Sequence, residues 1–328
     1  MKRKVILDVD TGSDDAIAIM CALLSQNIDV VAVCTVWGNT KVEYTTDNTL
    51  RLLSRMGRKI PVYAGIPTAL AKYLSPERCV DGTCQAVIDG KVVRIHDDHL
   101  KLPESKYKKQ DIPAPFFYMD YLSKAEEPVD IVAVGPLTNL GFALSLNPEL
   151  VSGINRMVIM GGGYRVGNVT GYTEANFWHD PEAAQIVLDS GVKPVLVPLD
   201  ATHEAFITKD EIDKIAKNNN FCSKFAADLL LQRMAVHTAT QPLRLKDAAT
   251  VHDALAVAYL TDPDMLKDLR EEHINVCFTG AAEGHCVIDR RESGEAVNCR
   301  FAYGADRERF AEYLIHTLGQ YEERQADI

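Results

Sequence analysis

"ILDVDTGSDDAIAI" (residues 6–19) places four aspartates, Asp8, Asp10, Asp14 and Asp15, between an apolar run and an apolar helical pattern. The apolar run predicts a buried strand, and Asp14 and Asp15 fall in the first turn of the helix that follows. Asp8 and Asp10 are two positions apart at the strand end, which predicts that they lie on the same side. Several ionised carboxylates this close need a counter-charge, so either some are protonated or a cation lies among them.

The fold class follows from the strands that resemble this first one. Short runs rich in β-branched residues recur, nearly continuous in apolar character, at 4–10, 29–38, 61–65, 130–135, 156–163 and 193–200. Such runs are typical of a parallel sheet buried on both faces. Helical patterns separate them at 14–25, 41–56, 136–146 and 180–190. We therefore predict an α/β fold with a doubly wound, mostly parallel open sheet and helices on both faces.

The second half of the chain predicts extra C-terminal helices near 222–236, 252–260 and 305–319, with one strand at 273–278. Thr208 and Glu211 fit a capping box at the start of a further helix. Residues 75–111 are polar and irregular, which favours an insertion or lid over the edge of the sheet. Because no linker-like stretch divides the 328 residues, we expect one domain over 1–328.

The composition of the chain limits the classes of partner that we expect it to bind. The formal net charge is −11, with no basic face, which argues against nucleic acid. No run approaches the roughly 20 apolar residues of a membrane helix, and the N-terminal apolar stretch is too short for a signal peptide. The eight cysteines are scattered, without a CxxC pair or zinc spacing. We expect a soluble, cytoplasmic protein that keeps buried thiols and binds small molecules or proteins.

Polar residues and glycines follow the predicted strands, at Gly38-Asn39, Gly135-Pro136, Gly161–Gly163 and Asp200. The carboxyl ends of parallel strands meet at one edge, where ligands bind in such sheets. Hard oxygen ligands without nearby histidine or thiol favour calcium or magnesium over zinc. An EF-hand does not fit, because it would need an oxygen ligand at Gly12 and a glutamate at Ile19.

Two interpretations of the acidic stretch remain at this point. Taken alone, Asp14 and Asp15 are typical of residues that interact with a helix dipole. A magnesium-dependent phosphatase of the haloacid dehalogenase type would use Asp8 as nucleophile and Asp10 as acid/base. The match to such phosphatases becomes poorer after these two aspartates, because a helix begins at once and no clear GDxxxD segment follows a later strand.

A second acidic position lies in "VHDALAVAYL" (251–260), where His252 and Asp253 begin an apolar helix. A capping aspartate explains such a pair when it is isolated. Together with the first stretch it belongs to a larger pattern. The chain resembles the calcium-dependent nucleoside hydrolases, which cleave the N-glycosidic bond of ribonucleosides, in segments that run in the family's order: "DVDTGSDDA" at 8–16, "GN" at 38–39, "VGPLTNL" at 134–140, "MGGGY" at 160–164, "TEANFWHDPEAA" at 173–184 and "VHDA" at 251–254.

The resemblance implies a site in which one Ca²⁺ is held by oxygen atoms from distant segments. The implied ligands are Asp10, Asp15, the main-chain carbonyl of Val134 and Asp253. The residues that would contact the ribose are Asp14, Asn39, Met160, Asn168, Glu174 and Asn176. If these residues do not contact ribose, the polar ones are ordinary polar groups of surface loops and Met160 is an ordinary core residue.

The implied reaction is hydrolysis to free base and ribose through an oxocarbenium-like transition state. Asp10 would act as general base on a water whose pKa the metal lowers, and His252 is the candidate acid for the leaving base. The alternative to an enzyme is a binding protein, which would bind a nucleoside or pentose through calcium without turnover. The intact Asp10 argues against this alternative. The resemblance also implies a homodimer or homotetramer.

The chain departs from the family's usual pattern in segments that should line the base pocket. These are the loop 78–102, Ala175 in place of a common aromatic residue, and 233–250. Purine or pyrimidine preference therefore does not follow from the sequence. The three histidines of these segments could be acids, contacts to the base or surface groups, and we expect surface groups; they are His96, His99 and His237.

Overall fold

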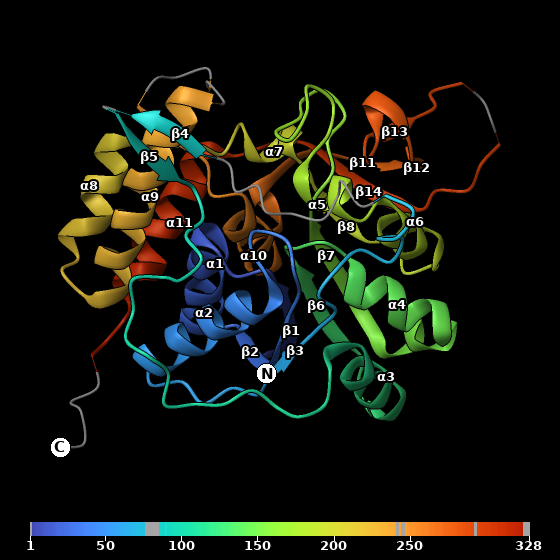
Figure 1. Cartoon of the computed structure of the whole chain (residues 1–328), viewed down its shortest axis with the longest axis horizontal. Helices are drawn as coiled ribbons and strands as arrows, with labels where there is room; N and C mark the ends of the chain where they lie inside the picture. Colours follow the sequence, from blue (N-terminus) through green and yellow to red (C-terminus); the bar gives the residue numbers. More distant parts are fainter. Residues whose placement is uncertain are drawn as a thin grey trace.

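The computed structural model describes residues 2–75, 85–88, 90–240, 243, 247–291 and 294–323. At its centre lies a sheet of eight strands: β1 Arg3–Val9, β2 Ile28–Thr35, β3 Val62–Ala64, β6 Val129–Ala133, β7 Ile154–Met160, β8 Val195–Val197, β11 Leu266–Glu272 and β14 Cys299–Ala305. Their order is β11-β14-β8-β7-β6-β1-β2-β3 (Figure 1). Neighbouring strands run parallel, except that β11 is antiparallel to β14.

Helices cover both faces of this sheet. On one face lie α1 Ser13–Leu24, α2 Val42–Arg55 and α10 His252–Thr261, with α8 Lys209–Lys217, α9 Phe221–Thr240 and α11 Arg307–Gly319 in a further layer. The other face carries α3 Ala114–Lys124, α4 Thr138–Leu146, α6 Pro181–Asp189 and the hairpin of β12 Ile274–Val276 and β13 Cys286–Ile288. In β1, Val5, Leu7 and Val9 pack toward α1, and Ile6 packs toward α3 and α4. The predicted fold class is confirmed.

The register brings the carboxyl ends of the central strands to one edge. Asp8 in β1 lies opposite Cys34 in β2 and Ala133 in β6. The segments that follow these strands therefore begin side by side, as the sequence predicted for the polar residues there.

Helix α1 lies at the centre of the molecule rather than on its surface. Every residue from Ser13 to Ala22 is buried, because the sheet covers one side and α9, α10 and α11 cover the others. Its alanines and those of α10 permit close packing of the two helices, which sets their N-termini next to each other.

The structure also differs from several sequence predictions. β8 ends at Val197, so Asp200 lies in a short helix, α7 Leu199–Thr202. The strand predicted at 273–278 is confirmed as β12, and it forms a separate hairpin with β13. β11, β14 and α3 were not predicted. β11 reads "LKDLREE" and is largely exposed at the edge of the sheet, so it lacks the apolar run that marks the central strands.

The capping box of Thr208 and Glu211 is confirmed. The Glu211 amide donates to Thr208 Oγ1 at 3.3 Å, and the Thr208 amide donates to Glu211 Oε2 at 2.8 Å. The remaining short elements are β9 Ile207–Thr208, β10 Ala248–Ala249, α5 Ala175–His179, and the 3₁₀ turns Pro148–Gly153, Pro263–Met265 and Gly280–Ala282.

The segment predicted to be an irregular insertion contains a hairpin of β4 Gln85–Ile88 and β5 Lys91–Arg94, which packs against α9. The chain then crosses the loop between β1 and α1, where His96 Nδ1 accepts a hydrogen bond from the Ser13 amide at 3.2 Å. This part is therefore a cover over the start of α1, and it is not irregular throughout. Residues 76–84 and 89 of the predicted insertion lie outside the described residues.

Among the described parts of the chain, no helix is both long and apolar enough to span a membrane. The cysteines described are all unpaired, and all but Cys277 are buried. Cys79 and Cys84 lie outside the described residues.

Candidate active site and metal centre

The loop between β1 and α1 is shaped by hydrogen bonds to its own carboxylates. Asp15 Oδ1 accepts from the Asp10 amide at 3.0 Å, and Asp15 Oδ2 accepts from the Gly12 amide at 2.9 Å. Asn39, which follows β2, donates through its side chain to Asp15 Oδ2 at 2.9 Å and through its amide to Asp10 Oδ2 at 2.7 Å. Asn39 therefore holds the two carboxylates in one arrangement.

This arrangement requires close approach of backbone to the carboxylates. A Cβ on Gly38, whose φ is +154°, would lie 2.1 Å from Asp10 Oδ2, and a Cβ on Gly12 would lie 2.1 Å from His96 Nδ1. On the other side, a Cβ on Gly135 would lie 3.0 Å from Asp10 Oδ1. The segments after β2 and β6 thus enclose Asp10, and glycine is needed where they do so.

Asp10 has one oxygen that its surroundings do not satisfy. The side chain is 1% exposed, and Oδ1 is buried without a hydrogen-bond partner. Burial raises the pKa of Asp10 well above its usual value, and repulsion from Asp15 raises it further. An orphaned carboxylate oxygen in such a place is stabilised by a proton or by a cation.

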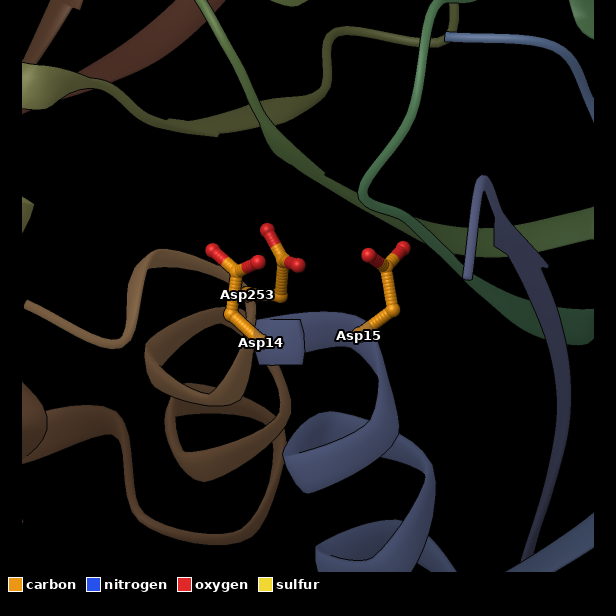
Figure 2. A group of neighbouring side chains, drawn as sticks. All are labelled: Asp14, Asp15 and Asp253. Atoms are coloured by element: carbon orange, nitrogen blue, oxygen red, sulfur yellow. The ribbon is translucent and has the colours of Figure 1, made fainter. Parts of the chain in front are cut away.

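Three further carboxylates gather beside it. Oxygen atoms of Asp14, Asp15 and Asp253 lie within 4.8 Å of one another, and all three residues are buried (Figure 2). Asp14 and Asp15 come from the first turn of α1 and Asp253 from the first turn of α10, so both helix dipoles favour negative charge here. Burial raises the pKa of Asp253, and repulsion from the aspartates of the α1 loop adds to the rise. These oxygens fit a hard divalent cation.

Asp8 does not join this group, although the sequence placed it beside Asp10. Its side chain lies toward α3 and α4, where Oδ2 accepts from the Tyr118 hydroxyl at 2.9 Å and from the Asn139 amide group at 3.1 Å. Burial raises the pKa of Asp8 to about 7. Its hydrogen bonds are made with α3 and α4, on the opposite face of the sheet from the cluster, so Asp8 is not placed to act there as the nucleophile of a phosphatase.

The predicted main-chain ligand lies at the end of β6. The Val134 carbonyl accepts from the Asn176 side chain at 2.8 Å, and the same Asn176 group donates to the Met160 carbonyl at 3.0 Å. A carbonyl oxygen has a second lone pair, so Val134 keeps acceptor capacity for a cation. The structure therefore brings Val134, Met160 and Asn176 together.

Glu174 and Asn168 organise the loop before α5. Glu174 Oε1 accepts from the Asn176 amide at 2.9 Å, and Oε2 accepts from the amides of Gly162 at 2.8 Å and Phe177 at 3.1 Å. Asn168 Oδ1 accepts from the Ala175 amide at 2.9 Å. Both residues thus have a clear structural task, and their contact with ribose stays a prediction.

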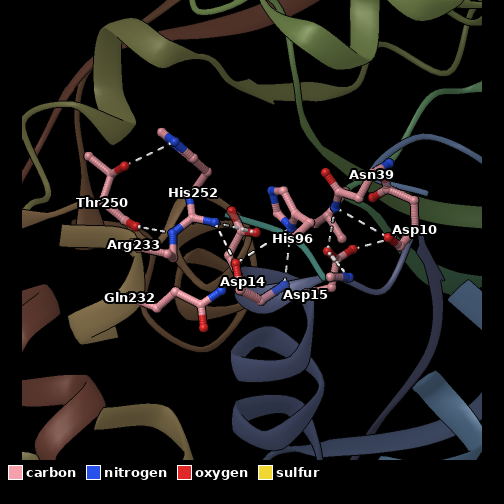
Figure 3. A network of polar contacts seen from close by, with 12 residues as sticks. Asp10, Asp14, Asp15, Asn39, His96, Gln232, Arg233, Thr250 and His252 are labelled. Atoms are coloured by element: carbon pink, nitrogen blue, oxygen red, sulfur yellow. Dashed lines mark hydrogen bonds and ion pairs between the residues drawn. The ribbon is translucent and has the colours of Figure 1, made fainter. Parts of the chain in front are cut away.

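His252 lies between two threonine hydroxyls. Nε2 is 3.0 Å from Thr250 Oγ1 (Figure 3). Nδ1 is 2.7 Å from Thr202 Oγ1. Burial lowers the pKa of His252 well below its usual value, and the nearby Arg233 guanidinium lowers it further. The ring is therefore neutral near pH 7, with its tautomer set by the two hydroxyls.

The histidines that we expected at the surface divide into two kinds. His99 is exposed, as predicted, and its Nδ1 lies 3.0 Å from Asp47 Oδ2. The prediction was wrong for His237, which is 2% exposed and lies 3.3 Å from Thr250 Oγ1, and for His96, which is part-buried over Gly12. His237 is buried because it lies on α9, which packs against β10 and the segment before α10.

Sequence reasoning also missed Arg233, Thr202 and Thr250. Arg233 interrupts an apolar helical stretch, "LLLQRMAV" (229–236), and a charged residue there is a recognisable signal of a buried ion pair. The two threonines carry no comparable signal, because threonine is common in loops of every kind.

The family model for inosine-uridine preferring nucleoside hydrolases matches residues 5–312. This chain belongs to that family. It is 34% identical to the pyrimidine-specific ribonucleoside hydrolase RihA of Photobacterium profundum, over 98% of this chain and 100% of the relative. Membership makes the chain an N-glycosyl hydrolase, so the resemblance drawn from the motifs is confirmed and the phosphatase alternative is excluded.

Solved structures agree with this assignment. The plant nucleoside hydrolase PpNRh1 superimposes with a TM-score of 0.85 at 30% identity, covering 97% of this chain and 99% of that one. The purine-preferring ribonucleoside hydrolase from Gardnerella vaginalis gives 0.83 at 29% identity, covering 97% and 98%. The open sheet with its helical layers is thus the fold of these hydrolases.

Because the carboxylates are crowded, we expect one substitution to have opposite effects on stability when the cation is absent and when it is bound. With chelator present, Asp253→Asn should raise the free energy of unfolding, because it removes a buried carboxyl group whose pKa is raised by burial and by the neighbouring aspartates. With a saturating divalent cation it should lower stability relative to the wild type. Urea unfolding in both buffers measures this.

Asp228→Asn is the matched control, because Asp228 is exposed on α9 and its substitution should change little in either buffer. Equal destabilisation of the Asp253→Asn variant with and without the cation would contradict the account.

Proposed function

We propose that this protein hydrolyses the N-glycosidic bond of ribonucleosides to free base and ribose, with Ca²⁺ bound at the carboxyl edge of the sheet. The observation that carries the proposal is the unpartnered Oδ1 of Asp10, buried beside Asp15 and Asp253 in a chain of this family. A cation would satisfy this oxygen, and an all-oxygen donor set favours calcium over zinc.

The residues that would hold the cation are Asp10, Asp15, Asp253 and the carbonyl of Val134. Asp15 is held in place before any ion binds by Asn39 and the amides of Asp10 and Gly12, and Asp10 Oδ2 is held by the Asn39 amide. When bound, the cation would lower the pKa of a water molecule and accept sugar hydroxyl oxygens as ligands.

The sugar would lie against residues at the same edge. Asp14, Asn39 and Asn176 are buried or half-buried polar residues next to the carboxylates, and Met160 lies under Asn176 with its sulfur 3.6 Å from that side chain. Asn168 and Glu174 would complete the contacts from the loop before α5. Because this loop is already ordered by hydrogen bonds, little conformational freedom would be lost when ribose binds.

Asp10 would act as the general base. One oxygen is fixed by the Asn39 amide, so the other can take a proton from the attacking water without reorientation. The water oxygen bonds to the anomeric carbon as the bond to the base nitrogen breaks, and the bonding electron pair leaves with the base. The sugar passes through an oxocarbenium-like transition state, which contacts to its hydroxyls would stabilise.

His252 would supply the proton to the departing base. In the structure both ring nitrogens contact hydroxyls, so donation requires one of these contacts, with Thr202 or Thr250, to open. The other hydroxyl then keeps the ring oriented. Donation by the neutral ring would leave an imidazolate, so His252 would have to donate from its imidazolium form, and its lowered pKa would have to rise when the nucleoside binds.

The experiment that tests the function is a panel of inosine, guanosine, uridine and cytidine, with released ribose measured before and after chelation. Both base classes belong in it, because the relatives named above are pyrimidine-specific in one case and purine-preferring in another. We expect ribose from at least one nucleoside, loss of activity with chelator, and recovery on adding calcium. Nucleoside binding by calorimetry without any ribose would instead identify a binder.

Asp10→Asn should lower kcat by at least about 10²-fold, the usual scale for a positioned general base, while the fold is retained. Stopped assays of ribose release measure this. The control is Asp29→Asn, since Asp29 is exposed on β2 and its loss should leave the rate unchanged. A rate near that of the wild type in Asp10→Asn would exclude the assigned role.

His252→Ala should slow natural nucleosides, whose bases need a proton to depart, and should spare nitrophenyl riboside, whose leaving group does not. The ratio of kcat/KM for the two substrates is the measurement. Equal slowing of both substrates would remove the acid role from His252.

A further inference from the structure

Arg233 is an arginine in the interior of the protein. It lies on α9 among apolar neighbours and is 1% exposed. Among the described residues it is the largest of the fully buried side chains. An arginine cannot shed its charge in such a place, so its burial requires charged and hydrogen-bonded partners. Those partners show what the residue does.

The guanidinium joins two parts of the site that are far apart in the sequence (Figure 3). Nη1 donates to Asp14 Oδ1 and to Ser13 Oγ, both at 2.8 Å, at the start of α1. Nε donates to the Thr250 carbonyl at 2.9 Å, just before α10. One side chain thus links the helix that carries Asp14 and Asp15 to the helix that carries His252 and Asp253.

The contact with Asp14 also decides which of its oxygens is free for a ligand. Because Oδ1 is taken by Arg233, Oδ2 is the oxygen left to meet a sugar hydroxyl or a cation. The ion pair further supplies positive charge beside a group of carboxylates that repel one another.

We propose that Arg233 is a positioning residue, which fixes Asp14 and the distance between the N-termini of α1 and α10 before calcium and the nucleoside bind. The proposal rests on the proposed function, because Asp14 is a sugar contact only if the site takes a nucleoside. Arg233 itself touches neither the sugar nor the cation. Its loss should therefore weaken binding more than it slows the chemical step.

Two substitutions test this in the full-length protein. Arg233→Met keeps much of the volume and removes the charge and the donors, and Arg233→Lys keeps the charge but cannot reach Asp14 and Thr250 together. The control is Lys224→Met, since Lys224 is exposed on the same helix. Circular dichroism and thermal melting in calcium establish that each variant is folded.

The first measurement is the Kd for calcium, obtained by calorimetry with calcium alone. The second is KM and kcat for the nucleoside that the wild type hydrolyses fastest. We expect Arg233→Met to raise the Kd for calcium and the KM at least tenfold each, with kcat reduced less than threefold. Arg233→Lys should fall between Arg233→Met and the wild type, and Lys224→Met should match the wild type. Unchanged Kd and KM in both Arg233 variants would overturn the proposal, and so would a loss confined to kcat. If Arg233→Met does not fold, the Arg233→Lys values decide alone.

A double-mutant cycle with Asp14→Asn separates positioning from general support of the fold. If Arg233 acts through Asp14, Arg233→Lys should raise KM by a much smaller factor in the Asp14→Asn background than in the wild type. The same factor in both backgrounds would overturn the proposal.

A wild-type protein that neither binds calcium nor releases ribose would mean that the proposed function fails. An active wild type with unaffected Arg233 variants would refute only the role of Arg233.

Discussion

The structure depends on how it holds several buried carboxylates close together. Asp10, Asp14, Asp15 and Asp253 come from two helix N-termini and one strand end, and burial and mutual repulsion raise the pKa of Asp10 and Asp253. The protein offsets part of this cost with two helix dipoles, the amides that bind Asp15, and the Arg233 guanidinium on Asp14. The unpartnered oxygen of Asp10 remains, and a divalent cation would satisfy it.

The fold brings these groups together by simple means. A central strand carries the chain to the carboxyl edge of the sheet, the short turn at residues 10–12 reverses it, and α1 runs back through the core beside α10. Small side chains between α1 and α10 let their N-termini approach, although more than 200 residues separate them in the sequence. The residues proposed for catalysis and cation binding thus lie at strand ends and helix starts, which suits a site that must hold several oxygens in fixed geometry.

Most of the central sheet could be predicted because β1, β2, β6, β7 and β8 are buried on both faces and their sequences are apolar runs. β11 was missed because it is an edge strand with exposed polar residues. β14 lies inside the sheet, but its sequence, "CRFAYGA", contains no run of β-branched residues. The crowding of Asp10, Asp14 and Asp15 was predicted from their place at a strand end and a helix start, whereas Asp253 was added through the resemblance to the family. Asp8 was predicted to lie beside Asp10, but it lies toward the other face of the sheet. Arg233, His237 and Thr250 were not, because their roles come from the packing of α9 against the start of α10, and no local pattern records that packing.

The central claim is that a single divalent cation joins the segments that carry Asp10, Asp15 and Asp253. Anomalous diffraction from crystals grown with calcium, recorded at long wavelength, tests it most directly. The account predicts one strong peak about 2.3–2.6 Å from an oxygen of each of these aspartates and from the Val134 carbonyl. A well-ordered site with no peak among these residues, or a peak bound elsewhere on the protein, would contradict it.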